Sequence, residues 1–130
     1  MKGNRKYVLG VSQPDNICYG GLKQYYLESQ KSNVVNFTYA HCAYLKFILN
    51  NVNCFNSNDA ITYTRIWLTD NDINGSNTYT GCAYYEGNFF ELPEGNYRYD
   101  WVVTKNGTST SFSQNFTLTN SDSTTFQINY

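Results

Sequence analysis

Hydrophobic and polar residues alternate along much of the chain, most regularly in its last third. Between positions 96 and 104, one side of an extended segment would carry Tyr97, Tyr99, Trp101 and Val103. This period of two is typical of a half-buried β-strand. The pair Asn106-Gly107 follows, and it favours a two-residue hairpin turn because both residues tolerate positive φ. The sequence therefore predicts a hairpin whose second strand covers residues 111–119.

A third alternating segment follows a polar turn at 120–123. Because short turns join the three segments, we expect residues 96–130 to form a three-stranded meander. Its core side is predicted to hold Tyr97, Tyr99, Trp101, Phe112, Phe116, Phe126 and Ile128.

The preceding segments repeat the pattern less regularly. Residues 59–69 and 78–90 are predicted to be strands, the second of them broken near 86–88. Period two also runs from 33 to 49, which is too long for one typical strand and is expected to bend, with a short helix over 43–49 as the alternative. Seven or eight short strands and no long helix predict an all-β, single-domain antiparallel β-sandwich. We assign residues 16–130 to this sandwich and residues 1–15 to an N-terminal arm or an edge strand.

Composition supports this fold class and excludes several others. The chain holds thirteen Tyr and eight Phe, and aromatic residues favour strands. With 41% hydrophobic residues, the 130-residue chain can bury a core and is not disordered overall. A net charge of −1 argues against a nucleic-acid-binding surface or a polybasic membrane patch. No run of 18 apolar residues exists to span a membrane.

Four cysteines leave the redox compartment open. Cys18, Cys42, Cys54 and Cys82 allow two disulfides in three pairings, and no Cys-x-x-Cys spacing suggests zinc. Four Asn-x-Ser/Thr sequons begin at positions 36, 74, 106 and 115. The apolar stretch after the N-terminal basic residues is too short for a signal peptide. A reduced protein made inside the cell is therefore favoured, and a secreted, disulfide-bonded protein is the alternative.

Candidate chemistry is sparse. The only histidine, His41, is expected to be a half-buried strand residue, and no catalytic nucleophile or carboxylate pair accompanies it. Residues 70–75 resemble the first half of a calcium loop, with oxygen ligands on Asp70, Asp72 and Asn74 and a glycine at the sixth position. The twelfth position, where a calcium loop carries glutamate, is Gly81. We therefore expect neither catalysis nor a bound metal or other cofactor.

Aromatic residues are the better candidates for binding. In a strand, one member of each adjacent pair Tyr25-Tyr26 and Tyr84-Tyr85 must face the opposite way from the other, so that one is directed outward. Outward tyrosines are common in interfaces. The N-terminal arm carries an apolar cluster suited to adding a strand to an exposed sheet edge. The predicted interaction residues are Tyr7, Val8, Leu9, Val11, Tyr25, Tyr26, Tyr84 and Tyr85.

The segment from 89 to 99 combines a hydrophobic strand, a Leu-Pro-x-Gly turn at 92–95 and a Tyr-x-Tyr strand at 97–99. This combination resembles immunoglobulin-like and transthyretin-like β-sandwich modules. The resemblance implies a β-sandwich of that kind and no particular activity.

These observations predict a non-catalytic structural or adhesive subunit of a larger assembly, such as a virion decoration or another surface particle. Its partners would be protein, either copies of itself or other subunits. The alternative is a secreted, glycosylated carbohydrate-binding module that uses exposed Tyr and Trp. Both hypotheses assign the protein a binding role.

Overall fold

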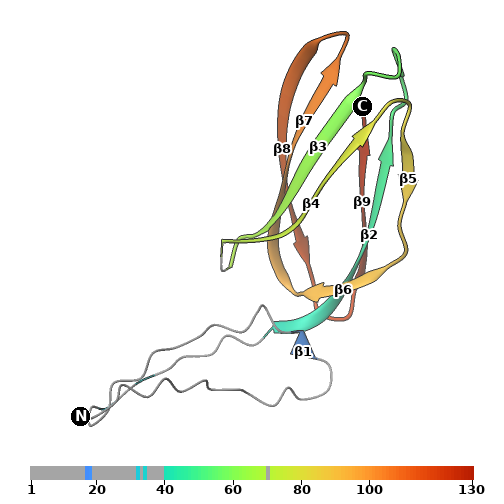
Figure 1. Cartoon of the computed structure of the whole chain (residues 1–130). Helices are drawn as coiled ribbons and strands as arrows, with labels where there is room; N and C mark the ends of the chain where they lie inside the picture. The colour runs from blue at the N-terminus through green and yellow to red at the C-terminus, as the bar shows by residue number, and fades with distance from the viewer. Residues whose placement is uncertain (1–16, 19–31, 33, 35–39, 70) are drawn as a thin grey trace, which may run out of the picture.

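The computed structural model describes residues 17, 18, 32, 34, 40–69 and 71–130, and these form two β-sheets packed face to face (Figure 1). Nine strands make up the sheets: β1 (Ile17–Cys18), β2 (Ala40–Asn50), β3 (Ala60–Trp67), β4 (Asp72–Thr80), β5 (Tyr84–Glu86), β6 (Phe90–Pro93), β7 (Gly95–Lys105), β8 (Thr108–Leu118) and β9 (Ser123–Asn129). The predicted all-β sandwich is confirmed. Within the described ranges, no helix is long and apolar enough to cross a membrane.

One sheet has the antiparallel order β4-β3-β7-β8. The other is built on β2, which pairs antiparallel with β1, β5 and β6 and parallel with β9. To compare this topology with others, we count strands from β2 and treat β5 and β6 as one interrupted strand. The sheet built on β2 then holds the first (β2), fourth (β5 and β6) and seventh (β9) strands. An antibody constant domain instead places its first, second, fourth and fifth strands together. The strand order therefore departs from that of the antibody constant domain.

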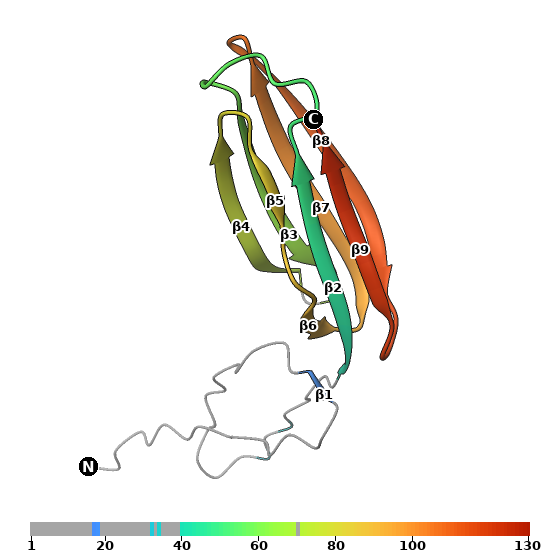
Figure 2. The same cartoon turned by 90° about the vertical axis from the view of Figure 1, so that its right-hand side faces the viewer.

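The predicted hairpin is confirmed, but the predicted meander is wrong. Asn106 and Gly107 have φ of 46° and 74°, as a type I′ turn requires, and they join β7 to β8. After β8 the chain crosses to the other sheet, where β9 runs beside β2 (Figure 2). There Phe126 and Ile128 lie level with Phe47 and Leu49, so both strands bury their apolar sides together. The alternation of residues correctly predicts which side of β9 faces the core. A strand in either sheet could turn that side to the core, so the alternation does not assign β9 to a sheet.

Most residues predicted to face the core do so. Tyr97 and Tyr99 are fully buried, and Phe126 and Ile128 are 5% and 2% exposed. Trp101 and Phe116 are half-buried at the margin of the core. Phe112 is the exception at 45% exposed, because the first half of β8 is left uncovered by the opposite sheet.

The Leu-Pro-x-Gly turn carries the chain from one sheet to the other. Gly95 has φ of 132°, and a Cβ there would lie 2.9 Å from Nε1 of Trp67, so glycine is required on both grounds. The hydroxyl of Tyr97 donates a hydrogen bond of 2.6 Å to the carbonyl of Pro93. This contact fixes the start of β7 against the end of β6.

Two disulfides decide the cysteine question that the sequence left open. Cys18–Cys42 joins β1 to β2, and Cys54–Cys82 joins the β2–β3 connection to the β4–β5 turn. Their Cα atoms are 4.7 and 5.2 Å apart, within the range that a disulfide can bridge. All four cysteines are therefore paired, contrary to the favoured expectation of a reduced protein.

Candidate functional site

The two long sides of the sandwich differ in how they are filled. The side formed by β4, β5 and β6, here called the closed side, is bridged by aromatic rings from both sheets. The ring of Tyr63 lies 4.7 Å from that of Phe47 and 6.3 Å from that of Tyr79, and Tyr79 lies 5.5 Å from Tyr85. These rings form a continuous connection from β2 through β3 and β4 to β5.

A buried arginine completes the closed side. Arg65 on β3 is 8% exposed, and its Nε and Nη2 donate to the side-chain and backbone oxygens of Asn74 at 2.7 and 2.5 Å. Its Nη1 donates to the Tyr99 hydroxyl at 3.2 Å, and the guanidinium lies 5.0 Å from the centre of the Phe90 ring. Gly75 lies opposite Arg65, and a Cβ there would be 3.0 Å from Nη2. Hydrogen bonds and aromatic faces therefore satisfy the guanidinium where it is buried.

On the opposite side, here called the open side, β8 and β9 are the outer strands and the sheets leave a groove between them. The groove has a volume of about 440 Å³, within the usual range of small-ligand sites. The Trp101 indole stacks on Phe112, with ring centroids 5.6 Å apart and planes 18° from parallel. The lining residues are Trp101, Val103, Lys105, Thr108, Thr110, Phe112, Asn129 and Tyr130.

Polar groups surround the aromatic floor of the groove. Lys105 donates to the carbonyl of Asn53 at 2.7 Å, and its Nζ lies 5.3 Å from the centre of the Tyr130 ring. Thr108 and Thr110 on β8 are exposed, as is Asn129 at the end of β9. The groove thus combines stacked apolar rings with hydroxyl, amide and ammonium groups, a combination that suits a ligand with both an apolar face and hydrogen-bonding groups.

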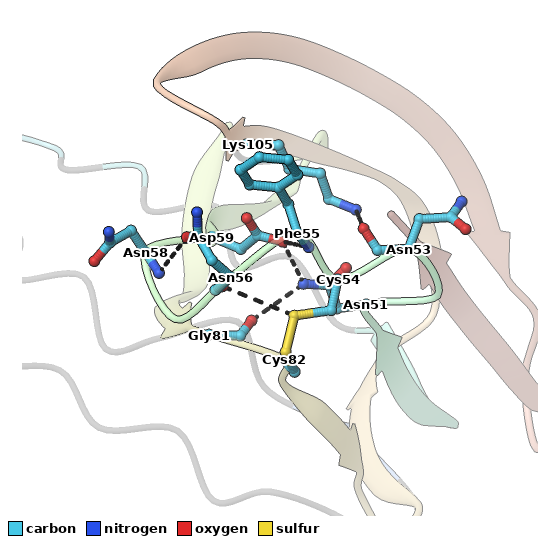
Figure 3. The surroundings of a disulfide bond; sticks show 10 residues. All are labelled: Asn51, Asn53, Cys54, Phe55, Asn56, Asn58, Asp59, Gly81, Cys82 and Lys105. Carbon is cyan, nitrogen blue, oxygen red and sulfur yellow. Dashed lines mark hydrogen bonds between the residues drawn. A yellow bond between two sulfur atoms is a disulfide. The ribbon is translucent and has the colours of Figure 1, made fainter.

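The loops at this end of the sandwich are held by a buried carboxylate (Figure 3). Oδ2 of Asp59 accepts hydrogen bonds from the Asn51 amide at 3.0 Å and from the backbone N–H of Phe55 at 2.9 Å. The Asn51 amide also donates to the carbonyl of Gly81 at 3.1 Å. The hydrogen bonds from Asn51 and Phe55 lower the pKa of Asp59, against the opposing effect of burial. Asp59 therefore stays ionised and fixes the loops next to the groove.

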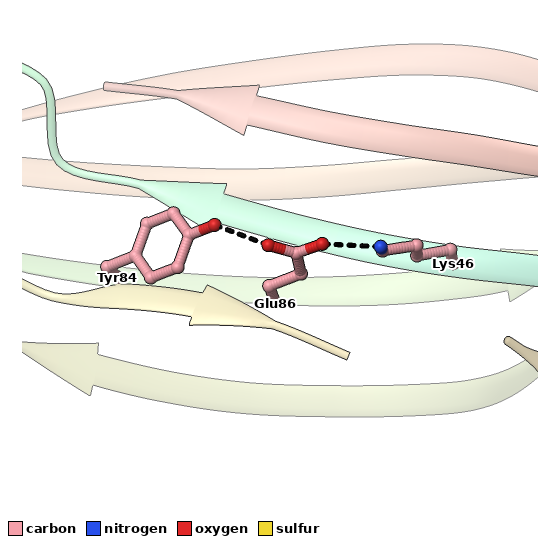
Figure 4. A network of polar contacts seen from close by, with 3 residues as sticks. All are labelled: Lys46, Tyr84 and Glu86. Carbon is pink, nitrogen blue, oxygen red and sulfur yellow. Dashed lines mark hydrogen bonds and ion pairs between the residues drawn. The ribbon is translucent and has the colours of Figure 1, made fainter. Parts of the chain in front are cut away.

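Of the predicted interaction residues, Tyr84 and Tyr85 lie in β5 and face opposite ways, as expected. Tyr85 faces inward and belongs to the closed side. Tyr84 is 62% exposed and its hydroxyl donates to Glu86 at 2.6 Å, while Glu86 pairs with Lys46 (Figure 4). The hydrogen bonds from Lys46 and Tyr84 lower the pKa of Glu86. Tyr84 is thus an exposed aromatic residue on the outer face that lines neither described pocket.

Six other predicted interaction residues, Tyr7, Val8, Leu9, Val11, Tyr25 and Tyr26, lie outside the described residues. The proposed role of the arm at 1–15 therefore stays a prediction.

The partial calcium loop is mostly strand. Asp70 lies outside the described residues, whereas Asp72 and Asn74 belong to β4, which pairs with β3. The side-chain oxygen of Asn74 accepts a hydrogen bond from Arg65. Among the described residues, one cluster of metal-ligand types contains Cys18, Cys42 and Glu91, but the two sulfurs are joined in a disulfide and offer no thiolate.

His41 departs from the prediction that it is half-buried. It is exposed at the start of β2, where its backbone N–H donates to Glu94 at 3.2 Å and its carbonyl accepts from the N–H of Glu94 at 2.7 Å. Burial alternates regularly along β2 only from Ala43 onward. At the start of the strand, Ala40 is the buried residue and not His41.

Sequence reasoning missed the groove, although one signal was available. On β8 three of the inward positions, Thr108, Thr110 and Gln114, are polar and exposed. Polar residues at inward positions indicate that the core does not reach that part of the strand. The core on β8 begins at Phe116, and Phe112 lies outside it, between polar inward neighbours.

In comparisons with known proteins, no family model, curated protein or solved structure matches the chain.

Proposed function

We propose that the protein is an extracellular binding module whose groove on the open side takes a neutral carbohydrate. The observation that carries the proposal is the stack of Trp101 on Phe112, which is 45% exposed, on the floor of a groove of about 440 Å³ with polar side chains around it. Neighbouring apolar groups that are accessible together and surrounded by polar groups commonly mark a binding site. The stacked pair inside the groove therefore supports a ligand site.

A sugar matches the groove because a pyranose has an apolar C–H face and a rim of hydroxyl groups. The C–H face would lie on the rings of Trp101 and Phe112. The hydroxyl groups of the sugar would bond with Thr110 and Asn129, which can each donate and accept. The one ionised side chain among the lining residues is Lys105, which is already engaged by Asn53 and Tyr130. The site therefore favours a neutral sugar over a charged one.

The two disulfides support an extracellular setting, because disulfides persist in oxidising compartments. Three of the sequon asparagines are described, and they differ in access. Asn74 is held by Arg65, whereas Asn106 and Asn115 are exposed. If the protein is glycosylated, we expect the glycans at the exposed positions rather than at Asn74.

A second role, as a subunit of a larger assembly, is favoured by a separate feature: the outer edge of β8, which no strand of the described residues pairs with. Both roles can belong to the same protein, because the groove and the strand edge use different groups.

The carbohydrate proposal is tested by screening neutral oligosaccharides of cellulose, mannan, xylan and chitin type against the folded protein, followed by calorimetric titration of any that bind. Phe112→Ala is expected to weaken binding at least tenfold, because it removes half of the aromatic stack. Tyr84→Ala is the matched control, since it removes an even more exposed aromatic residue outside the groove. The proposal is overturned if no oligosaccharide binds, or if Tyr84→Ala lowers the affinity as much as Phe112→Ala.

A further inference from the structure

The outer strands of the two sheets differ in how well they are protected from pairing with another chain. A free sheet edge presents unpaired N–H and C=O groups, and proteins usually blunt it with charge, proline, bulges or short length. The edge strand β4 contains Asp72 and a register shift opposite Arg65 and Ile66. β5 and β6 are only three and four residues long. These edges carry the usual protection.

β8 carries none of these devices. It is eleven residues long and contains no charged residue and no proline. All of its residues from Thr108 to Asn115 are exposed, and it pairs with β7 along its full length without a bulge. In the described part of the chain, β7 is its sole partner in the sheet. β9 is also uncharged, but it is shorter, at seven residues. β8 is therefore the edge most suited to strand addition.

The turn determines which backbone groups of β8 are free. A two-residue turn makes its flanking residues, Lys105 and Thr108, a hydrogen-bonded pair. Because hydrogen-bonded and non-hydrogen-bonded pairs alternate in an antiparallel ladder, every second residue from Ser109 onward directs its N–H and C=O away from β7. These residues are Ser109, Ser111, Ser113, Asn115 and Thr117. Their side chains lie on the outer face, and all are short, polar and uncharged.

These properties favour a second copy of the same strand as the occupant. If two β8 strands pair antiparallel about Ser113, then Ser111 lies opposite Asn115 of the other copy, and no pair brings like charges together. The nearest outer-face charges on β7, Arg98 and Asp100, already pair with each other at 2.9 Å. The edge therefore offers no charge complementarity to a basic or acidic partner, whereas it complements itself.

We propose that the protein forms a twofold dimer by antiparallel pairing of β8 with β8 of a second copy, which joins the two four-stranded sheets into one continuous sheet. This inference does not depend on the carbohydrate proposal, since it uses backbone groups of β8 and its test measures mass and not sugar binding.

The test is the native mass of the full chain by light scattering over a range of concentrations, with backbone amide exchange measured in parallel. The expected mass is twice 15.0 kDa, falling on dilution. Amide protons of Ser111 and Ser113 should be protected at high concentration and exchange freely on dilution. Ser111→Lys should raise the dimer dissociation constant at least tenfold, because a charged edge resists pairing.

Thr62→Lys is the matched control, because it adds the same charge to the exposed outer face of the same sheet on a central strand. It should leave the dimer intact. Asn115→Glu is a second edge variant that keeps the test valid if Ser111→Lys is unstable, since its charge lies beside Arg98. A monomer at all concentrations overturns the proposal. So does a dimer that survives both edge variants, and a dimer that is instead lost on deletion of residues 1–12 would assign the interface to the arm.

Discussion

The closed and open sides of the sandwich contain the same kinds of residues, but only the closed side is filled by them. Both are lined by Tyr, Phe or Trp directed inward from facing sheets. On the closed side, the β4–β5 connection joins the sheets and the disulfide Cys54–Cys82 holds that turn. On the open side, β8 and β9 are joined only at the end far from the Asn106-Gly107 turn. The sheets therefore part near this turn, and inward aromatic residues line a groove there instead of being buried in the core.

The largest contrast is expected between two phenylalanines. Phe47→Ala should lower the free energy of unfolding by about 3–5 kcal/mol, because the ring is 3% exposed and contacts Tyr63, Tyr85 and Tyr99. Phe112→Ala should lower it by less than about 1 kcal/mol, because nearly half of that side chain is in solvent. Urea unfolding measures both. Equal losses would show that the two sides do not differ as described.

Removal of the disulfide next to the closed side should have the next largest effect. The double variant Cys54→Ser with Cys82→Ser removes the covalent link between residues 28 positions apart. We expect the free energy of unfolding to fall by about 2–4 kcal/mol. Thermal unfolding with and without reductant provides the measurement, and a melting temperature insensitive to reductant would contradict the pairing.

A substitution at Gly75 tests the buried arginine of the closed side. Gly75→Val should destabilise the protein by about 1–3 kcal/mol, because the added carbons meet the guanidinium of Arg65 within about 3 Å. Thr80→Val on the same edge strand is the control and should change stability by less than about 0.5 kcal/mol, because Thr80 is exposed. Equal stability of the two variants would contradict the close approach of the Arg65 guanidinium to position 75.

The smallest predicted effect is a loss of stability in alkali. Burial raises the pKa of Tyr63 to about 12, above its ordinary value of 10.0. Between these values the unfolded chain releases the proton while the folded chain retains it, so stability is complete below pH 10 and falls as the pH rises toward 12. Tyr63→Phe should reduce the slope of unfolding free energy against pH in this interval. An unchanged slope would show that Tyr63 does not cause the loss of stability in alkali.

The sequence predicted the sandwich and most inward-facing residues because alternation reports directly on burial. It also predicted the β7–β8 turn, since Asn106 and Gly107 adopt the positive φ that their types favour. It could not assign β9 to a sheet, because Phe126 and Ile128 would face the core from either one. The groove was missed because Thr108 and Thr110 show only that the core ends on β8, whereas the separation of the facing sheets also depends on their connections.

The central claim, that the open side is the binding surface, is tested most directly by mapping the NMR chemical shifts of the folded protein during titration with an oligosaccharide from the screen. The account predicts that the largest changes occur at the Trp101 indole N–H and at the backbone amides of Thr110, Phe112 and Asn129. Tyr84, Glu86 and Lys46 on the outer face should not shift. Changes centred on Tyr84, or no changes at millimolar oligosaccharide, would contradict the claim.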